Sequence, residues 1–213
     1  MFIDRTDAGI RLSKELSKYE DQDVVVVAIP RGGLPVAEKV AKSLGAPLEV
    51  ALVKKLGHPV NKEYAIGAVS LKNLVVSETA DISKKYIELE TDRIRGILKK
   101  RHDQYYRTHA PESIEGKTVI IIDDGIATGN TVMATAELAQ TQHPAKLVVA
   151  IPVAPISAVQ KFKESPLVDE VVCLATPPNF QAVGQFYRYF SQVSDDEAIS
   201  IMDRYHNEWP GNS

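Results

Sequence analysis

The chain is poor in cysteine, in long apolar runs and in any excess of one charge. Its single cysteine, Cys173, excludes a disulfide within the 213 residues, and its apolar neighbours predict a core position. No apolar run approaches the roughly 20 residues of a membrane span, and no secretory signal is visible at the start. Lys and Arg total 25 against 28 Asp and Glu, a formal net charge of −3. These absences predict a cytoplasmic protein that binds neither membrane nor nucleic acid.

Three common phosphate and phosphatase motifs are also missing. The Walker A pattern needs a lysine before its Ser or Thr, and residues 129–131 read Gly-Asn-Thr. The dinucleotide fingerprint needs Gly-x-Gly-x-x-Gly, a spacing that Gly125 and Gly129 do not have. An aspartyl-phosphate phosphatase needs Asp-x-Asp, whereas Asp123 and Asp124 are adjacent. The acidic pair therefore belongs to none of these three classes of site.

What the chain does contain is an alternation of short apolar strands with helical patterns. Hydrophobic residues make up 44% of the chain and charged residues 25%, which is ordinary for a globular domain of this length. Strands are predicted at 24–29, 48–53, 119–122, 147–152 and 170–174, with a hairpin at 65–71 and 74–76. Helices are predicted at about 8–19, 35–44, 84–106, 130–139, 157–162 and 195–205. This alternation predicts an α/β fold with a mostly parallel central sheet and helices on both faces.

Residues 118–131, with the sequence Thr-Val-Ile-Ile-Ile-Asp-Asp-Gly-Ile-Ala-Thr-Gly-Asn-Thr, are the most informative stretch. The strand has no polar alternation, which indicates burial on both faces. Asp123 and Asp124 would then lie at its carboxyl end, the edge where open α/β sheets bind ligands. The small residues after them can curl so that backbone N–H groups and a helix N-terminus hold a phosphate. Two carboxylates beside an anion site suit sugar hydroxyls or a hydrated Mg²⁺.

A second turn, at residues 30–33, has the same position after the first strand. Arg31 offers a planar fork for phosphate, and Gly32 and Gly33 allow a ligand close to the backbone. Lys54 follows the next predicted strand and could counter phosphate charge. Residues 55–64 read as a loop that could act as a lid.

Together these segments resemble type I phosphoribosyltransferases over about residues 20–190. The acid pair, glycines and threonines of 118–131 match the loop of that family that binds phosphoribosyl pyrophosphate (PRPP). The turn at 30–33 is similar to its pyrophosphate loop, which often holds a cis peptide bond not preceding proline. The resemblance implies that Asp123 and Asp124 are catalytic and hold Mg²⁺, directly or through ribose hydroxyls or water. It implies that the 5′-phosphate is bound by Gly125, Ala127, Thr128, Gly129, Asn130 and Thr131, and the pyrophosphate by Arg31, Gly32, Gly33 and Lys54.

The resemblance leaves the acceptor base open. Ala127 stands where many 6-oxopurine enzymes carry a further carboxylate, so the loop is closer to that of adenine enzymes. Residues 178–190 are faintly similar to the hood of hypoxanthine-guanine enzymes. Phe180, Phe186 and Tyr187 are candidate base contacts on that ground, and core packing is the alternative for all three.

The implied organisation is one domain over residues 1–213, with a core at about 20–175, a C-terminal hood at about 176–194 and a terminal helix at 195–206. The implied reaction joins PRPP and a nitrogenous base, with a purine favoured, into a nucleoside 5′-monophosphate and pyrophosphate, as in nucleotide salvage. A homo-dimer is the expected assembly. The alternative is a PRPP-binding regulatory protein on the same fold, for which the basic residues 99–102 are the candidate nucleic-acid surface.

Overall fold

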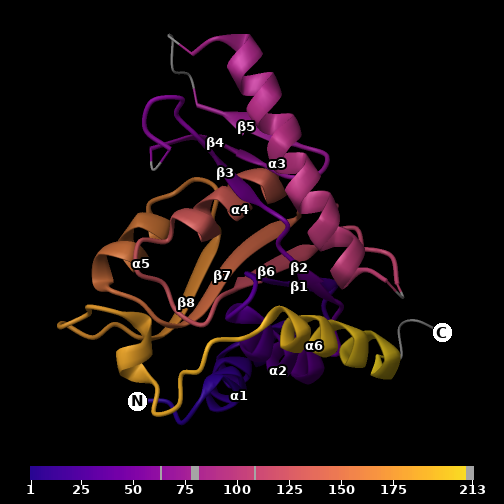
Figure 1. Cartoon of the computed structure of the whole chain (residues 1–213). Helices are drawn as coiled ribbons and strands as arrows, with labels where there is room; N and C mark the ends of the chain where they lie inside the picture. Colours follow the sequence, from indigo (N-terminus) through magenta and orange to yellow (C-terminus); the bar gives the residue numbers. More distant parts are fainter. Residues whose placement is uncertain (63, 78–81, 108, 210–213) are drawn as a thin grey trace.

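A central parallel sheet carries helices on both faces, and a second, smaller sheet stands beside it (Figure 1). This computed structural model describes residues 1–62, 64–77, 82–107 and 109–209. The central sheet has the order β2-β1-β6-β7-β8, and every neighbouring pair in it is parallel. Its strands are β1 (Val24–Ala28), β2 (Leu48–Val50), β6 (Thr118–Ile122), β7 (Lys146–Val153) and β8 (Glu170–Ala175). The predicted fold class is confirmed.

Burial on both faces follows from the unbroken apolar strands. Alternate residues of β1 and β6 face two different clusters: Val26 and Ile120 lie in one, Val27 and Ile121 in the other. The first cluster is covered by α1 (Arg5–Glu15), α2 (Gly33–Leu44) and α6 (Asp195–Glu208), and the second by α4 (Asn130–Gln140) and α5 (Ile156–Lys163). Figure 1 shows α1, α2 and α6 below the sheet, α4 above it and α5 at its left. Both layers hold the carboxyl ends of β1 and β6 in fixed positions.

The helix ends agree with their capping chemistry. Ser194 caps the N-terminus of α6, and its hydroxyl accepts from the Glu197 N–H at 3.1 Å, as the Ser-Asp-Asp-Glu pattern predicts. Asp4 caps α1 in the same way through the Asp7 N–H. Gly45 ends α2 at φ 60°, a left-handed conformation that glycine adopts at low cost.

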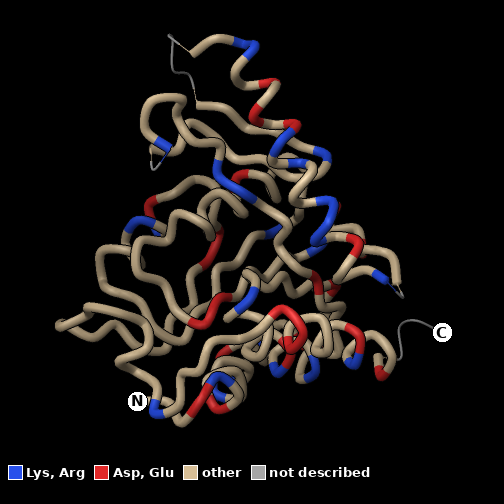
Figure 2. The backbone as a smooth tube through the Cα atoms, in the orientation of Figure 1, with Lys and Arg blue, Asp and Glu red and all other residues tan. Residues whose placement is uncertain are grey.

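The small sheet contains the predicted hairpin and corrects the predicted end of the second strand. The second strand, predicted over 48–53, ends at Val50, and β3 (Lys54–Gly57) begins a separate antiparallel sheet with β4 (Ala65–Val69) and β5 (Leu74–Val76). The predicted hairpin is confirmed as the pair β4 and β5, and β3 adds a third strand to it because the chain leaves the central sheet at 51–53 and pairs β3 with β4. The helix α3 (Lys84–Tyr105) packs along it through Ile94 and Leu98. Lys/Arg and Asp/Glu segments alternate along α3 (Figure 2).

The first residues of the chain pair with the hood. The Phe2 N–H donates to Phe186 O at 2.7 Å, and Phe2 O accepts from the Arg188 N–H at 2.9 Å. Short 3₁₀ turns lie at Ser17–Tyr19 and, in the hood, at Val183–Phe186. Within the described residues, no helix combines the length and the apolar character that crossing a membrane requires.

Candidate functional site

The two carboxylates lie directly after β6, in the middle of the sheet edge. Asp123 turns back so that its Oδ1 accepts from the Asp124 N–H at 2.9 Å. Asp124 has 9% of its surface exposed, and the Tyr187 hydroxyl donates to its backbone oxygen. Asp123 and Asp124 therefore lie between the carboxyl end of β6 and the hood.

The turn at 30–33 packs against this acid pair. A Cβ on Gly32 would lie 2.2 Å from Asp124 Oδ2, and one on Gly33 would lie 2.7 Å from Ile122 O. Only glycine leaves room for this approach. The peptide bond between Pro30 and Arg31 is cis, as the resemblance implies for this turn. The two loops that the sequence analysis singled out thus form one continuous surface.

The loop at 125–131 presents its polar residues outward and its glycines inward. Ala127, Thr128, Asn130 and Thr131 are exposed, whereas Gly125 and Gly129 are buried. Gly129 has φ 71° and precedes the first residue of α4, and a Cβ there would meet the Phe162 ring at 2.5 Å. The loop therefore ends on a helix N-terminus that faces solvent, a geometry suited to an anion.

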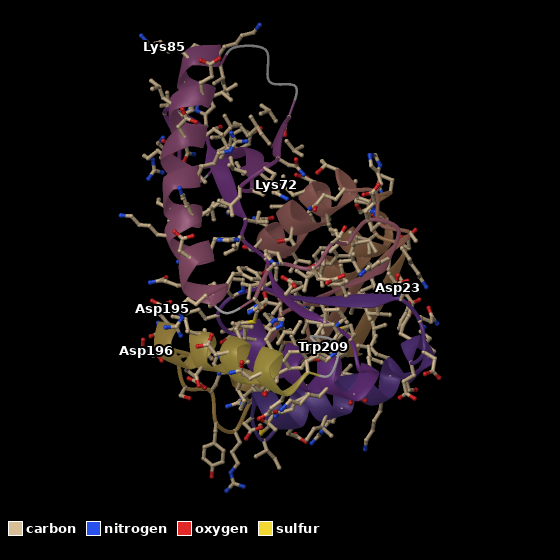
Figure 3. The ribbon with its side chains drawn as sticks, turned by 90° about the vertical axis from the view of Figure 1, so that its right-hand side faces the viewer. Asp23, Lys72, Lys85, Asp195, Asp196 and Trp209 are labelled. Carbon is tan, nitrogen blue, oxygen red and sulfur yellow. The ribbon has the colours of Figure 1, made fainter. Side chains whose placement is uncertain are left out.

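Arginines from two other elements enter the site. Arg5, the first residue of α1, places Nε 2.7 Å from Asp124 Oδ2, and the two side chains are 11% and 12% exposed. Arg31 Nη1 lies 3.1 Å from Asp195 Oδ1 at the start of α6. Figure 3 shows Asp195 and Asp196 at that end of α6, near the lower end of α3. A pocket of about 350 Å³ lies between the two arginines, lined by Asp124, Gly32 and residues 190–193.

Burial raises the pKa values of both carboxyls in the acid pair. Burial raises the pKa of the Asp123 carboxyl well above its ordinary value, and the charge of Asp124 adds to that rise. Burial also raises the pKa of Asp124, while the Arg5 guanidinium opposes it. A cation brought to this edge would relieve the repulsion between the two carboxylates.

The three hood aromatics take different positions. Phe180 and Phe186 stack with ring centroids 5.2 Å apart, in a small cluster with Val183, whose methyl group abuts Gly125. Tyr187 is buried at 5% exposure and donates its hydroxyl to Asp124 O. Tyr187 thus ties the hood to the acidic loop, and the Phe180–Phe186 pair lies beside that loop.

Lys54 belongs to the small sheet, and the predicted lid overlaps β3 and the loop that joins β3 to β4. Lys54 opens β3 opposite Val69, so it does not end a strand of the central sheet as predicted. Residues 55–57 belong to the same strand, which leaves 58–62 and Tyr64 as the described loop; residue 63 lies outside the described residues. In that loop Lys62 donates to the Tyr86 hydroxyl of α3 at 2.6 Å. The roles of Lys54 and of a lid stay predictions.

Comparison with known proteins gives the family. The family model "Phosphoribosyl transferase domain" matches residues 4–189. A Mycobacterium tuberculosis protein with a provisional phosphoribosyl transferase name is 40% identical over 214 aligned residues, which cover 98% of this chain and 48% of that protein. The chain thus spans about half the length of the curated relatives it matches. It belongs to the phosphoribosyl transferase family, a family of transferases.

Solved structures share this fold. The crystal structure of TT1426 from Thermus thermophilus has a TM-score of 0.88 and 38% identity, covering 96% of this chain and 98% of that one. A Neisseria gonorrhoeae protein solved with bound ppGpp has a TM-score of 0.50 and 14% identity over 94% and 92% of the two chains. At that identity the second likeness shows the fold alone.

Sequence reasoning missed Arg5 and Asp195, and it did not foresee the Tyr187 hydroxyl contact. Arg5 and Asp124 are 119 positions apart, and Arg31 and Asp195 are 164 apart. Arg5 stands in no motif, and the capping pattern around Asp195 predicts only the start of a helix, so no local pattern could have paired either residue with the site. The pairing of the N-terminal segment with the hood and the packing of α1 on α2 bring Arg5 to the acid pair.

Proposed function

We propose that this protein transfers the phosphoribosyl group of PRPP to a nitrogenous base. In this reaction the bond between ribose C1 and the pyrophosphate oxygen breaks, and a bond from C1 to a ring nitrogen of the base forms. The displaced electron pair leaves with pyrophosphate, and the base loses its ring N–H proton to solvent or a nearby acceptor. The observation that carries the proposal is the contact between the 30–33 turn and Asp124, which joins an arginine-bearing loop to the acidic and small-residue loop.

Each loop would serve one part of PRPP. The N–H groups and hydroxyls of residues 125–131 would bind the 5′-phosphate at the start of α4. Asp123 and Asp124 would meet the ribose hydroxyls, and their charge suits a ribose that becomes cationic as pyrophosphate departs. Arg31 and the backbone at Gly32 and Gly33 would stabilise the leaving pyrophosphate.

Mg²⁺ is the cation that this donor set fits. Within the described residues, no group of three or more His, Cys, Asp or Glu side chains is placed to enclose a metal ion. Mg²⁺ commonly binds one or two carboxylates together with water and substrate phosphates, so a site completed by PRPP suits Asp123 and Asp124. When bound, Mg²⁺ would supply positive charge to the leaving pyrophosphate.

A purine is the acceptor we favour. The stacked Phe180 and Phe186 lie beside Gly125 through Val183 and offer an apolar surface next to the ribose position. The buried ring of Tyr187 suits an anchor of the hood better than a stacking surface. Ala127 offers no carboxylate to the base, so discrimination would rest on stacking and backbone contacts.

The experiment is a pyrophosphate-release assay with PRPP, Mg²⁺ and a panel of adenine, hypoxanthine, guanine, xanthine, uracil and orotate. We expect release with one purine and the matching nucleoside monophosphate as co-product. Release with none of the bases, while PRPP still binds in a calorimeter, would favour the PRPP-binding regulator instead. Absence of both binding and release would refute the proposal.

Asp123→Asn is the sharpest variant, because asparagine keeps an oxygen for the Asp124 N–H. We expect kcat/KM to fall by roughly 10²-fold, since the variant removes a charge that stabilises the transition state. Asp92→Asn, on the exposed side of α3, is the matched control and should keep wild-type kinetics. Equal rates for the two variants would remove Asp123 from the mechanism.

A further inference from the structure

We propose that Arg5 is a positioning residue of the site, which fixes the Asp124 carboxylate where the ribose of PRPP would meet it. This inference rests on the proposed function and deepens it. It makes the first turn of α1 part of the site, although both substrate-binding loops lie elsewhere in the chain.

Arg5 is held on three sides. Its Nε lies 2.7 Å from Asp124 Oδ2, its Nη1 donates to Ser191 O at 2.7 Å, and its Cζ stands 3.9 Å from the centre of the Phe190 ring. An arginine held at its fork and its face has one orientation, and lysine could not make all three contacts. With Nε and Nη1 both engaged inside the protein, Arg5 acts on Asp124 and Ser191.

The backbone carries Arg5 to this place. The Phe2 N–H and O bond to the hood at residues 186 and 188, and Ile3 O accepts from the Tyr189 N–H at 2.9 Å. The Asp4 carboxylate caps α1 by accepting from the Asp7 N–H at 2.8 Å. Arg5 thus stands between an extended segment joined to the hood and a capped helix, so its position is fixed before any ligand binds.

Asp124 depends on this contact for the direction of its carboxylate. Its backbone is held by the Tyr187 hydroxyl and by Asp123, and Gly32 closes one side. Among the described residues, Arg5 is the only one that forms an ion pair with the Asp124 carboxylate. Without Arg5 the carboxylate could rotate into the adjoining pocket of about 350 Å³. Displacements of about 1 Å at a reacting centre can cost on the order of 100-fold in rate.

The test compares Arg5→Gln and Arg5→Lys with Arg11→Gln, a control on the same helix whose side chain pairs with Asp7 instead. With PRPP, Mg²⁺ and the acceptor base found above, we expect Arg5→Gln to lower kcat between ~10- and ~100-fold, with KM for PRPP changed less than about threefold. Arg5→Lys should recover part of the loss, and Arg11→Gln should match the wild type.

Two kinetic outcomes would overturn the proposal. If Arg5→Gln raised KM at unchanged kcat, Arg5 would be a ligand of PRPP in its ground state. If its kinetics matched those of Arg11→Gln, Arg5 would have no part in the reaction. Rates are measured well below the unfolding midpoint of each variant, so that lost stability does not appear as lost turnover.

A second measurement does not depend on activity. We expect the backbone amide NMR signals of Gly32 and Asp124 to shift in Arg5→Gln and to stay in place in Arg11→Gln. Unmoved signals in both variants would show that Asp124 keeps its position without Arg5, which refutes the inference. A wild type that neither binds PRPP nor releases pyrophosphate would refute the proposed function, while the NMR comparison would still decide the role of Arg5.

Discussion

Gly32 shows that a residue can shape the site by having no side chain. Its φ of −61° and ψ of −32° are open to any residue, so its backbone conformation does not require glycine. The requirement is space, because a Cβ would lie 2.2 Å from the Asp124 carboxylate, itself held by Arg5. The closeness of the two loops is therefore set at this single position.

Gly32→Ala tests that requirement. We expect the methyl group to push the Asp124 carboxylate away from Arg5, lowering the free energy of unfolding by about 1–3 kcal/mol and transfer activity more than tenfold (~1 Å of displacement suffices). Gly96→Ala in α3 is the control: nothing lies within 4 Å of its Cβ, and alanine should stabilise the helix by up to ~1 kcal/mol. Denaturant unfolding and pyrophosphate release measure both effects. Wild-type activity in Gly32→Ala would show that the loops adjust freely.

At the scale of elements, α3 and the small sheet form an arm with its own core. Leu56, Ile66, Val69, Ile94 and Leu98 are buried together, in a cluster separate from the two that cover the central sheet. Figure 1 shows the arm standing above the central sheet. A separate core of this kind can open without unfolding the rest of the molecule.

Ile94→Ala tests whether the arm opens by itself. The side chain is 2% exposed, so its truncation should cost about 2–5 kcal/mol. We expect amides of β3 and β4 to exchange faster with deuterium while β1 and β6 keep their protection. Leu89→Ala, at 63% exposure on the same helix, should leave all four strands unchanged. Faster exchange throughout the central sheet would show one cooperative unit instead.

Periodicity predicted most elements and missed the boundary between the two sheets. The apolar runs at 24–29 and 119–122 predicted the buried strands observed at 24–28 and 118–122, because burial on both faces leaves no polar alternation. The apolar run at 48–53 was taken as one strand, since hydrophobicity does not show where a chain leaves one sheet for another. The pairing of Leu56 with Gly67, which defines the small sheet, depends on contacts that a local pattern does not contain.

At the scale of the whole molecule, the site depends on segments far apart in the sequence. Residues 123–131 and 30–33 could be recognised because each carries its chemistry locally, in acids, glycines and an arginine. Arg5 and Asp195 could not, because an ion pair between distant residues follows from how α1, α6 and the hood pack. The sequence therefore predicts which loops bind the substrate and leaves open what holds them in place.

The edge strand β2, which pairs with β1, carries a buried acid. Glu49 on β2 is 5% exposed; it accepts from the Tyr106 hydroxyl and, at 2.8 Å, from the Glu112 N–H. It lines a cavity of about 350 Å³ between the central sheet, α4 and the turn after β4. Burial raises the pKa of its carboxyl to about 7.

This raised pKa predicts how the stability of the whole molecule changes with pH. Between an unfolded pKa of 4.5 and the folded value of about 7, the folded state keeps a proton that the unfolded state has lost. The contribution of neutral Glu49 to the free energy of unfolding is therefore fully present below pH 4.5. As pH rises to about 7 this contribution is lost, which lowers the free energy of unfolding by on the order of 3 kcal/mol. Glu49→Gln is neutral in both states and should lack this contribution.

Urea unfolding of wild type and Glu49→Gln between pH 4.5 and 8 measures the difference. We expect the stability of the variant relative to wild type to rise with pH up to about pH 7 and then to level off, because only the wild type has to ionise a buried carboxyl. Glu88→Gln, at an exposed position on α3, is the control and should follow the wild-type curve. A constant difference between Glu49→Gln and wild type would mean that Glu49 is already ionised in the folded protein at pH 4.5. The Tyr106 and Glu112 hydrogen bonds would then outweigh the cost of its burial.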